Sequence, residues 1–331
     1  MARFGVSPTR NKVSEYRPAK VTAAVLVYIP QSEGYYRHRL DVLRLNLESL
    51  IQTSAGECDL LVFDNGSSQE VVDYLQSLHQ AGKIDLLMLS SRNLGKIGAL
   101  QLMFNAAPGE YIAYCDDDIL FYPGWLQAHL EVFDAFPNVG VVSGLPVRDA
   151  ARHAVGSNQQ FVDSNPAGLS VKFERWIEED WDLDWAESTG RDLEQHREAF
   201  KDFQDPLWEM SGVKAFPAAN HFQFVARKDV ILKALPEEWS GRLMGRMVEL
   251  DQAIDAQGCL RLSTAGRYVR HIGNVVSPRL ADDIRGLGLD LEVTQVARRE
   301  KLHWLLRIPR MWHFLERIYS KLFDLLYQVE R

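Results

Sequence analysis

The chain has 331 residues, of which 46% are hydrophobic, 25% charged and 10% aromatic. These proportions are typical of globular proteins and exclude the disordered, collagen-like and disulfide-stapled classes. Acidic residues outnumber Lys and Arg by 45 to 37, which gives a net charge of −8, so nucleic acid is not expected as a partner. The length fits two ordinary domains, or one large α/β domain with additions.

The spacing of the cysteines indicates a reducing compartment, and the lack of long hydrophobic runs argues against export and against a membrane span. Cys58, Cys115 and Cys259 lie far apart, without a Cys-x-x-Cys pair that would predict a zinc or redox motif. The first ten residues lack the apolar core of a signal peptide, and no run of about 18 apolar residues occurs. We therefore expect a cytoplasmic protein that does not span a membrane.

Apolar strands alternate with helical periodicity over the first 145 residues. Residues 21–29 form a nearly continuous β-branched run, typical of a strand buried on both faces. Further strands are predicted at 59–63, 84–89, 111–115 and 139–143, and helices at 39–51, 70–79, 98–107 and 125–136. This alternation favours a doubly wound α/β sheet with parallel strands, whose ligands bind at the carboxyl ends of the strands. The absence of GxxxxGK[ST] and of GxGxxG after the first strand argues against P-loop NTPases and ordinary dinucleotide dehydrogenases.

Three consecutive aspartates, Asp116, Asp117 and Asp118, end the strand in YIAYCDDDILF. Like charges this close raise one another's pKa unless a cation compensates, and hard divalent ions prefer carboxylate oxygens. Strand alternation would place Asp116 and Asp118 on one face and Asp117 on the other. The pattern predicts a divalent cation at this strand end; the simpler alternative is an exposed acidic turn.

Several segments, in this order, resemble the nucleotide-sugar glycosyltransferases of the GT-A fold, most closely family 2. They are the opening strand VTAAVLVYI, DNGS at 64–67, RNLGKIGALQLMFNAA at 92–107, and the three aspartates followed by Pro123-Gly124-Trp125. Later, ELDQAIDAQG at 249–258 and RHIGN at 270–274 resemble an acid-bearing helix and a metal-side histidine. The resemblance implies an α/β GT-A fold with a doubly wound mixed sheet flanked by helices.

The expected organisation follows from this resemblance and from composition. We expect an N-terminal extension (1–20), a nucleotide-sugar-binding half (21–145), an acceptor-binding half (146–280) and a C-terminal helical extension (281–331). Between about 150 and 215 an inserted acidic helical segment is predicted, because residues 174–209 carry 13 acidic and four basic residues with Trp176, Trp181 and Trp185. This insert is either a lid packed by its tryptophans or an acceptor-binding surface. Beyond it, residues 221–226 predict a strand and 247–256 a helix.

The C-terminal residues 296–330 show a helical pattern interrupted by Pro309, and residues 298–331 carry eight basic and four acidic side chains. Such basic amphipathic helices either pack on the body of the protein or on a second copy, or lie on an anionic membrane surface. Both interpretations stay open, so peripheral contact with the inner face of the membrane is one expectation.

The resemblance assigns roles at the donor site. Asp118, Asp116 and His271 would hold Mn²⁺ or Mg²⁺, with Asp116 also near the ribose and Asp117 less constrained. Asp64, with Asn65 beside it, would accept a hydrogen bond from the nucleobase, although a turn-forming aspartate is the alternative. Arg92, Asn93 and Lys96 precede a predicted helix, where an anion is favoured; Lys96 is alternatively an ordinary exposed lysine.

The resemblance also calls for a general base near the start of a late helix. Asp251 is favoured as the base and Glu249 is the second choice; Leu250 splits the acidic pair usual in the family, so the choice between the two stays open. Asp255 shares the helix face of Asp251 and is alternatively a solvated charge. His221 is a weaker candidate for lining the acceptor side.

The function implied is that of a metal-dependent glycosyltransferase. It would transfer a sugar from a UDP- or GDP-sugar to a hydroxyl acceptor, inverting the anomeric carbon by a single displacement, in glycan or glycoconjugate synthesis. One alternative is a catalytically silent sugar-nucleotide-binding or assembly protein, whose hallmark would be loss of the acids. A sugar nucleotidyltransferase is the other, disfavoured because no Gly-rich basic turn follows the first strand.

Overall fold

The computed structural model describes residues 5–289 except 55, 238–242, 245–246 and 278. The described residues belong to one compact unit. The predicted C-terminal helices of residues 296–330 lie outside the described residues. Within the described part of the chain, no helix combines the length and the apolarity needed to cross a membrane.

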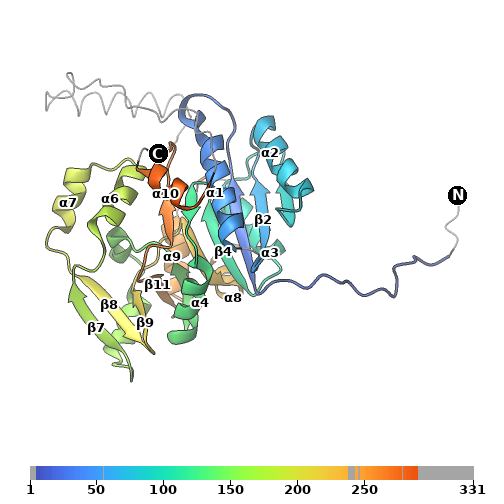
Figure 1. Ribbon diagram of the computed structural model, residues 1–331. Helices are drawn as coiled ribbons and strands as arrows, with labels where there is room; N and C mark the ends of the chain where they lie inside the picture. Colours follow the sequence, from blue (N-terminus) through green and yellow to red (C-terminus); the bar gives the residue numbers. More distant parts are fainter. Residues whose placement is uncertain (1–4, 55, 238–242, 245–246, 278, 290–331) are drawn as a thin grey trace, which may run out of the picture. The chain divides into compact units, whose positions relative to one another are not determined.

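A ten-stranded mixed sheet forms the centre of the molecule, in the order β3-β2-β1-β4-β10-β6-β11-β9-β8-β7 (Figure 1). Its first four strands pair in parallel, as the alternation predicts. The strand β10 runs antiparallel between β4 and β6, which makes the sheet mixed. The bounds of these strands are β1 (Val21–Val27), β2 (Cys58–Asp64), β3 (Leu86–Leu89), β4 (Tyr111–Asp116), β6 (Val139–Ser143), β10 (Gln223–Arg227) and β11 (Leu260–Thr264).

Helices pack on both faces of this sheet, as a doubly wound fold requires. The buried run of β1 shows why, because Val25 and Val27 join one hydrophobic cluster while Ala24 and Leu26 join another on the opposite face. The predicted helices occur within three residues of their expected bounds. They are α1 (Arg39–Ser54), α2 (Gln69–Gln80), α3 (Lys96–Ala106), α4 (Trp125–Ala135) and α9 (Met247–Asp255), accompanied by η1 (Gly34–Tyr36), α8 (Lys228–Ala234) and α10 (Leu280–Gly286). The mixed α/β class is confirmed.

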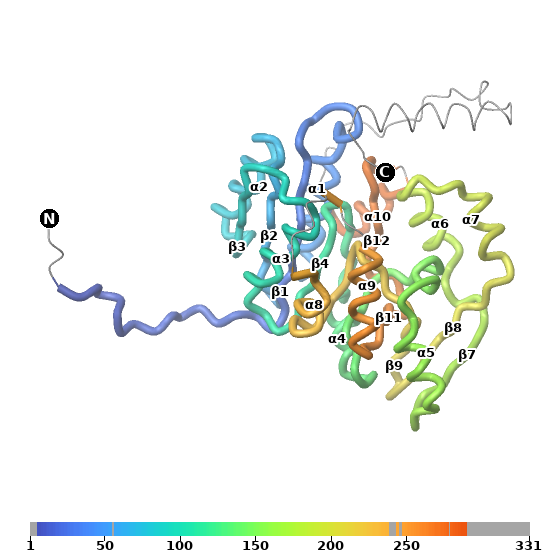
Figure 2. Tube along the Cα trace, turned by 180° about the vertical axis from the view of Figure 1, so that it is seen from behind, coloured from blue at the N-terminus to red at the C-terminus, as the bar shows by residue number. Residues whose placement is uncertain are grey.

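The insert contains helices, as expected, but it also contributes strands that were not predicted. Its helices are η2 (Arg148–Arg152), α5 (Gly156–Asp163), α6 (Glu179–Ser188) and α7 (Leu193–Phe200). Its remaining segments extend the central sheet as antiparallel strands, namely β7 (Ser170–Glu174), β8 (Asp205–Met210) and β9 (Val213–Phe216). Figures 1 and 2 show these strands at the end of the sheet remote from β3. β7 is largely exposed, and although its residues SVKFE alternate between polar and apolar, the run is only five residues long, which is a weak signal for a strand.

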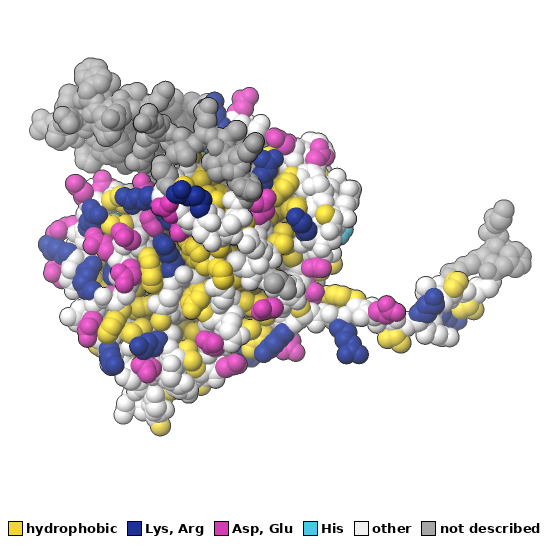
Figure 3. All heavy atoms as spheres, viewed as in Figure 1, with side chains coloured by type: hydrophobic (Ala, Val, Ile, Leu, Met, Phe, Trp, Pro, Cys, Tyr) yellow, Lys and Arg dark blue, Asp and Glu magenta, His cyan; other side chains and the backbone are white. Residues whose placement is uncertain are grey.

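A buried ion network joins elements of the insert to one another. Arg148 bonds Asp205 through Nε and Nη2, both at 2.9 Å, and its Nη1 lies 3.2 Å from Asp182. His196 Nε2 lies 2.8 Å from the same carboxylate of Asp182. The acidic residues of the insert are therefore not all a solvated face. On the surface shown in Figure 3, basic and acidic side chains are interspersed rather than gathered by sign.

Candidate functional site

Polar side chains gather where β1, β2 and β4 end. These strands are parallel and in register, with Leu26 opposite Asp116 and Val27 opposite Asp64, so their carboxyl ends share one edge. A cavity of about 240 Å³ opens there. Its lining includes six of the predicted site residues, which are Asn65, Asn93, Lys96, Asp116, Asp117 and Asp118. Residues that the sequence did not predict complete it, among them Tyr28, Tyr36, Arg39, Leu243, Met244 and Asn274.

Arg39, the first residue of α1, bridges two of the three aspartates. Its Nη1 donates to Asp118 Oδ2 at 2.9 Å, and its Nη2 bonds Asp117 Oδ1. The same guanidinium reaches the carbonyl oxygen of Gly273 at 3.3 Å and Asn274 Oδ1 at 3.2 Å. Since β4 ends at Asp116, strand alternation no longer applies, and Asp117 faces Arg39 beside Asp118 rather than the opposite side.

The two bridged carboxyl groups differ in proton affinity. Burial raises the pKa of Asp117 to about 6, because the effect of burial outweighs the opposing attraction of Arg39. Burial also acts on Asp118, but His271 and Arg39 together hold the pKa of Asp118 below its usual value. Asp118 is therefore the carboxylate that stays ionised at mildly acidic pH.

Asp116 has a separate cation. Lys96 Nζ lies 2.7 Å from Asp116 Oδ1 and 3.0 Å from Oδ2, and the hydroxyl of Tyr114 donates to the same carboxylate. Lys96 is buried and begins α3, so it is not an ordinary exposed lysine. The ammonium group and the free N–H groups of a helix start together favour an anion at this place.

His271 reaches the aspartates from a two-stranded sheet formed by β5 (Ile119–Phe121) and β12 (Val269–His271), in which it lies opposite Ile119. Its Nε2 lies 3.6 Å from Asp118 Oδ2, and its Nδ1 lies 2.9 Å from Ser188 Oγ of the insert. Asp118 Oδ1 and Asp117 Oδ2 are buried and make no hydrogen bond within the described part of the chain. Unpartnered carboxylate oxygens beside an imidazole fit a divalent cation such as Mn²⁺ or Mg²⁺.

The loop after β2 packs against the loop before α3. Asn65 Nδ2 donates to Asn93 Oδ1 at 3.0 Å, and Asn65 Oδ1 accepts from the backbone N–H of Leu94 at 2.8 Å. Gly66 has φ +90°, and a Cβ there would lie 2.8 Å from the backbone carbon of Arg92, so only glycine permits this approach. The two loops thereby hold Asn65 and Asn93 on the cavity wall.

Asp64 and Arg92 are predicted site residues that do not line this cavity. Asp64 is buried and accepts from the backbone N–H groups of Gly66 and Ser67 at 3.3 Å, which is the turn-forming arrangement named as its alternative. Burial raises the pKa of Asp64 against the hydrogen bonds from Ser67. The side chain of Arg92 is exposed. Neither residue is among those that line the 240 Å³ cavity.

Asp251 lies in a second cluster, apart from the residues that line this cavity. Its Oδ2 lies 3.1 Å from His153 Nε2 and 3.0 Å from His221 Nδ1, and its Oδ1 lies 2.7 Å from Arg261 Nη2. Although burial opposes ionisation, hydrogen bonds from the two histidines and the charge of Arg261 lower the pKa of Asp251 to about 2. His153 and Arg261 were not predicted, since neither carries a local motif.

The other acids of α9 have different surroundings. Glu249 is exposed. Asp255 accepts hydrogen bonds from the backbone N–H groups of Gly156 and Ser157 at 3.1 and 2.7 Å, so it fastens the start of α5 rather than standing in solvent. Of the acids on this helix, Asp251 alone has histidines bonded to it in the described structure.

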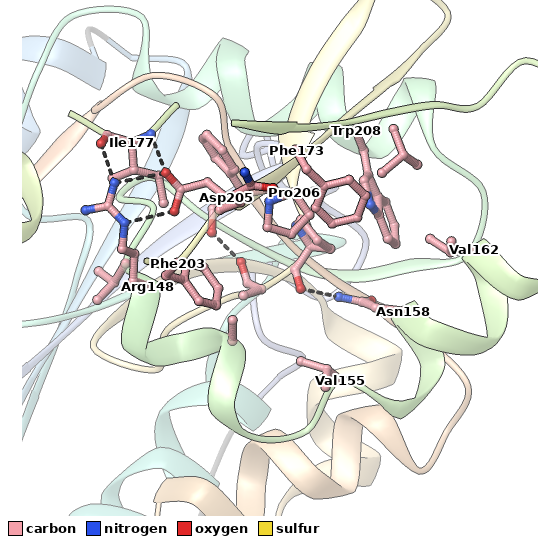
Figure 4. A pocket seen from close by; sticks show the side chains of 18 of the residues that line it. Arg148, Val155, Asn158, Val162, Phe173, Ile177, Phe203, Asp205, Pro206 and Trp208 are labelled. Atoms are coloured by element: carbon pink, nitrogen blue, oxygen red, sulfur yellow. Dashed lines mark hydrogen bonds and ion pairs between the residues drawn. The ribbon is translucent and has the colours of Figure 1, made fainter. Parts of the chain in front are cut away.

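A larger cavity of about 350 Å³ lies within the insert (Figure 4). Its wall is mostly apolar and includes Phe173, Trp208 and Val162. Three of its polar side chains are already bonded within the protein: Arg148 pairs with Asp205, and Asn158 Nδ2 donates to the carbonyl oxygens of Pro217 and Arg261, both at 2.8 Å. This cavity therefore offers mainly apolar contacts to a ligand.

Comparison with known proteins places this geometry in context. Residues 35–193 match the family model described as glycosyl transferase family 2. An uncharacterised glycosyltransferase of Nostoc sp. is 28% identical over 103 residues, which are 31% of this chain and 32% of that protein. The chain thus spans about a third of the length of that curated relative.

Two solved structures show weaker similarity. TarS of S. aureus, as a 1–349 fragment, is 11% identical with a TM-score of 0.42, over 76% of this chain and 60% of that one. A mannosyltransferase of Pyrobaculum calidifontis, solved with GDP-Man and Mn²⁺, is 22% identical with a TM-score of 0.33, over 43% of this chain and 41% of that one. It is the match of residues 35–193 to the family model that confirms the predicted resemblance of this chain to the family 2 glycosyltransferases.

Proposed function

We propose that this protein is a metal-dependent glycosyltransferase that moves a sugar from a UDP- or GDP-sugar to a hydroxyl acceptor. The observation that carries this proposal is the pair of buried carboxylates at the strand edge, Asp117 and Asp118, each with an oxygen that makes no hydrogen bond within the described residues. Such oxygens beside His271 suit a divalent cation. The match to family 2, over residues 35–193, includes Asp117 and Asp118.

The donor would bind across the 240 Å³ cavity. Asp118, Asp116 and His271 are the residues that would hold Mn²⁺ or Mg²⁺, and Lys96 supplies a further positive charge at the start of α3. A divalent ion bound there offsets the negative charge that develops on a leaving diphosphate. Asn65 and Asn93 offer amide groups to the nucleotide, while the proposed contact of Asp64 with the nucleobase requires a change in its turn hydrogen bonds.

The transfer itself is proposed to be a single displacement. The acceptor oxygen bonds the anomeric carbon while the bond from that carbon to the diphosphate oxygen breaks, and the nucleoside diphosphate leaves with the electron pair. The acceptor proton must pass to a protein group, and the cluster around Asp251 is the proposed place. A displacement in one step inverts the configuration of the anomeric carbon.

The insert is proposed to form the acceptor side. Its apolar cavity adjoins the Asp251 cluster, because Asn158 lines the cavity and bonds both the carbonyl oxygen and the N–H of Arg261 at 2.8 and 3.0 Å. Arg261 in turn pairs with Asp251. An acceptor with an apolar portion would therefore find apolar contacts next to the proposed proton-accepting groups.

Arg39 favours a second candidate, a metal-free nucleotide-sugar-binding protein. Its guanidinium already offsets the negative charge of Asp117 and Asp118 by bonding one oxygen of each. In such a protein Arg39 would take over the electrostatic role of the ion toward the diphosphate.

A panel of nucleotide sugars screened by melting temperature, with and without Mn²⁺, distinguishes these candidates. The proposed enzyme predicts a rise in melting temperature with one donor class that requires Mn²⁺. A rise that chelator leaves unchanged supports the metal-free candidate. The absence of any rise across UDP- and GDP-sugars contradicts both.

A further inference from the structure

Asp251 and three side chains around it form a cluster that brings together two elements and two loops. The carboxylate belongs to α9, Arg261 to β11, His153 follows η2, and His221 precedes β10. Both histidines bond the same carboxylate oxygen, Oδ2, at 3.1 and 3.0 Å, while Arg261 holds the other oxygen at 2.7 Å. Every oxygen of Asp251 therefore has a cationic or hydrogen-bonding partner.

Asp251 is poorly placed to take a proton from an acceptor itself. Its side chain is 4% exposed, and that of Arg261 is fully buried. The hydrogen bonds from the histidines and the charge of Arg261 also lower the pKa of Asp251 to about 2, so the carboxylate holds a proton weakly near neutral pH. An acceptor hydroxyl would have to displace one of three existing partners to reach it.

His221 is better placed in both position and exposure. The carbonyl oxygen of the next residue, Phe222, accepts from the backbone N–H of Asp116 at 2.9 Å, and the Phe222 ring lies 5.1 Å from the ring of His271. His221 is thus adjacent in the chain to a residue that contacts the proposed donor site twice. Its side chain is 34% exposed, and its Nε2 makes no hydrogen bond with any described residue.

We propose that His221 is the catalytic base, and that Asp251 and Arg261 are positioning residues that hold its imidazole ring; this rests on the proposed function. With Nδ1–H donating to Asp251, Nε2 carries the lone pair that accepts a proton. As the acceptor oxygen bonds the anomeric carbon, its O–H bond breaks and the proton passes to Nε2. The carboxylate of Asp251 then stabilises the imidazolium, as the aspartate does in other His–Asp pairs.

A metal ion is the competing occupant of this cluster. One nitrogen of each histidine and one oxygen of Asp251 lie within 4.8 Å of one another, close enough to share an ion. Arg261, however, already balances the charge of Asp251 from a fully buried position, so a dication would add uncompensated positive charge there. The charge balance therefore favours hydrogen bonds over a metal ion.

The test measures release of nucleoside diphosphate from the nucleotide sugar that gives the largest melting shift, with water as the acceptor. His221→Ala should lower this rate by about 10²-fold or more while the melting shift with donor and Mn²⁺ persists. Added imidazole should restore part of the rate in His221→Ala and none in Asp251→Asn. His153→Gln is the matched control, since it removes the other histidine from the same oxygen, and less than a tenfold loss is expected.

The pH profile of kcat/KM distinguishes a positioning role of Asp251 from a purely structural role. The charged and titratable groups that the structure places about His221 are Asp251, Arg261 and His153. Because the Asp251 carboxylate stabilises the imidazolium, Asp251→Asn should shift the acid limb of kcat/KM to lower pH. An unshifted limb would contradict the positioning role.

Three outcomes would overturn the proposal. Turnover by His221→Ala at the wild-type rate would remove His221 as the base, with the donor-binding proposal intact. Stabilisation by Zn²⁺ alone that disappears in both His153→Gln and His221→Ala would assign the cluster to a metal ion. Failure of the wild-type protein to bind any nucleotide sugar would remove the proposed function, and this inference with it.

Discussion

Replacement of Arg39 by methionine tests the electrostatics of the strand edge. Methionine has an apolar side chain of similar length, so the substitution fills the same space but leaves Asp117 and Asp118 buried without their shared cation. Removing one partner of a buried ion pair costs about 3–5 kcal/mol. Because Arg39 is 10% exposed at its side chain and serves two carboxylates, the free energy of unfolding should fall by about that amount.

The stability lost in Arg39→Met should also depend on pH, because the charge of Asp117 depends on pH. Its pKa is raised to about 6, so at pH 5 the folded protein holds a proton on this carboxyl group, and one of the two uncompensated charges is absent. The destabilisation should therefore be smaller at pH 5 than at pH 8. Urea unfolding of Arg39→Met and of the exposed control Arg37→Met at both pH values measures this.

A divalent cation should partly replace the missing guanidinium. If Mn²⁺ binds the freed carboxylates, saturation at about 100 times its Kd would return about 2.7 kcal/mol. A loss below about 1 kcal/mol in Arg39→Met, equal to that of Arg37→Met and independent of pH, would refute the view that this arginine balances two buried charges.

Three further predictions follow from other parts of the site. Asp118→Ala should abolish the Mn²⁺-dependent rise in melting temperature given by a nucleoside diphosphate, and an unchanged rise would argue against Asp118 as a ligand. Gly66→Ala should lose at least 1 kcal/mol more stability than Gly82→Ala in urea unfolding, because both have positive φ but a Cβ at Gly82 meets nothing within 4 Å. Since the pKa of Asp251 is lowered from 3.8 to about 2, its ionisation contributes about 2 kcal/mol to the free energy of unfolding; this contribution is present above pH 4 and lost as the pH falls toward 2. Asp251→Asn should make the free energy of unfolding less dependent on pH between 4 and 2. The same slope in the variant and in the wild type would contradict this prediction.

Much of the first half was predictable because its signals are local. The apolar run of β1 feeds cores on both faces of the sheet, and the helical spacing of α1 to α4 follows directly from the sequence. The polar residues after β2 and β4 were predictable from topology, since parallel strands bring their carboxyl ends to one edge. Their assembly into one cavity follows from that rule.

The remaining parts depend on contacts distant in sequence. Arg39 meets Asp118 across 79 residues, and nothing around Arg39 distinguishes it from other arginines near a helix start. Arg261 lies within the buried strand β11 and is identified only by its pairing with Asp251. The strand β7 is mostly exposed and only five residues long, so its alternation was a weak signal, and its antiparallel pairing with β8 defines it.

The account depends most on a divalent cation and a nucleoside diphosphate binding together at the strand edge. Calorimetric titration of the wild-type protein with UDP and with GDP, in Mn²⁺ and in chelator, measures this directly. We expect one of the two nucleotides to bind in Mn²⁺ and to lose at least about tenfold in affinity in chelator, equivalent to about 1.4 kcal/mol. Binding of neither nucleotide, or equal affinity with and without the metal, would contradict the central claim.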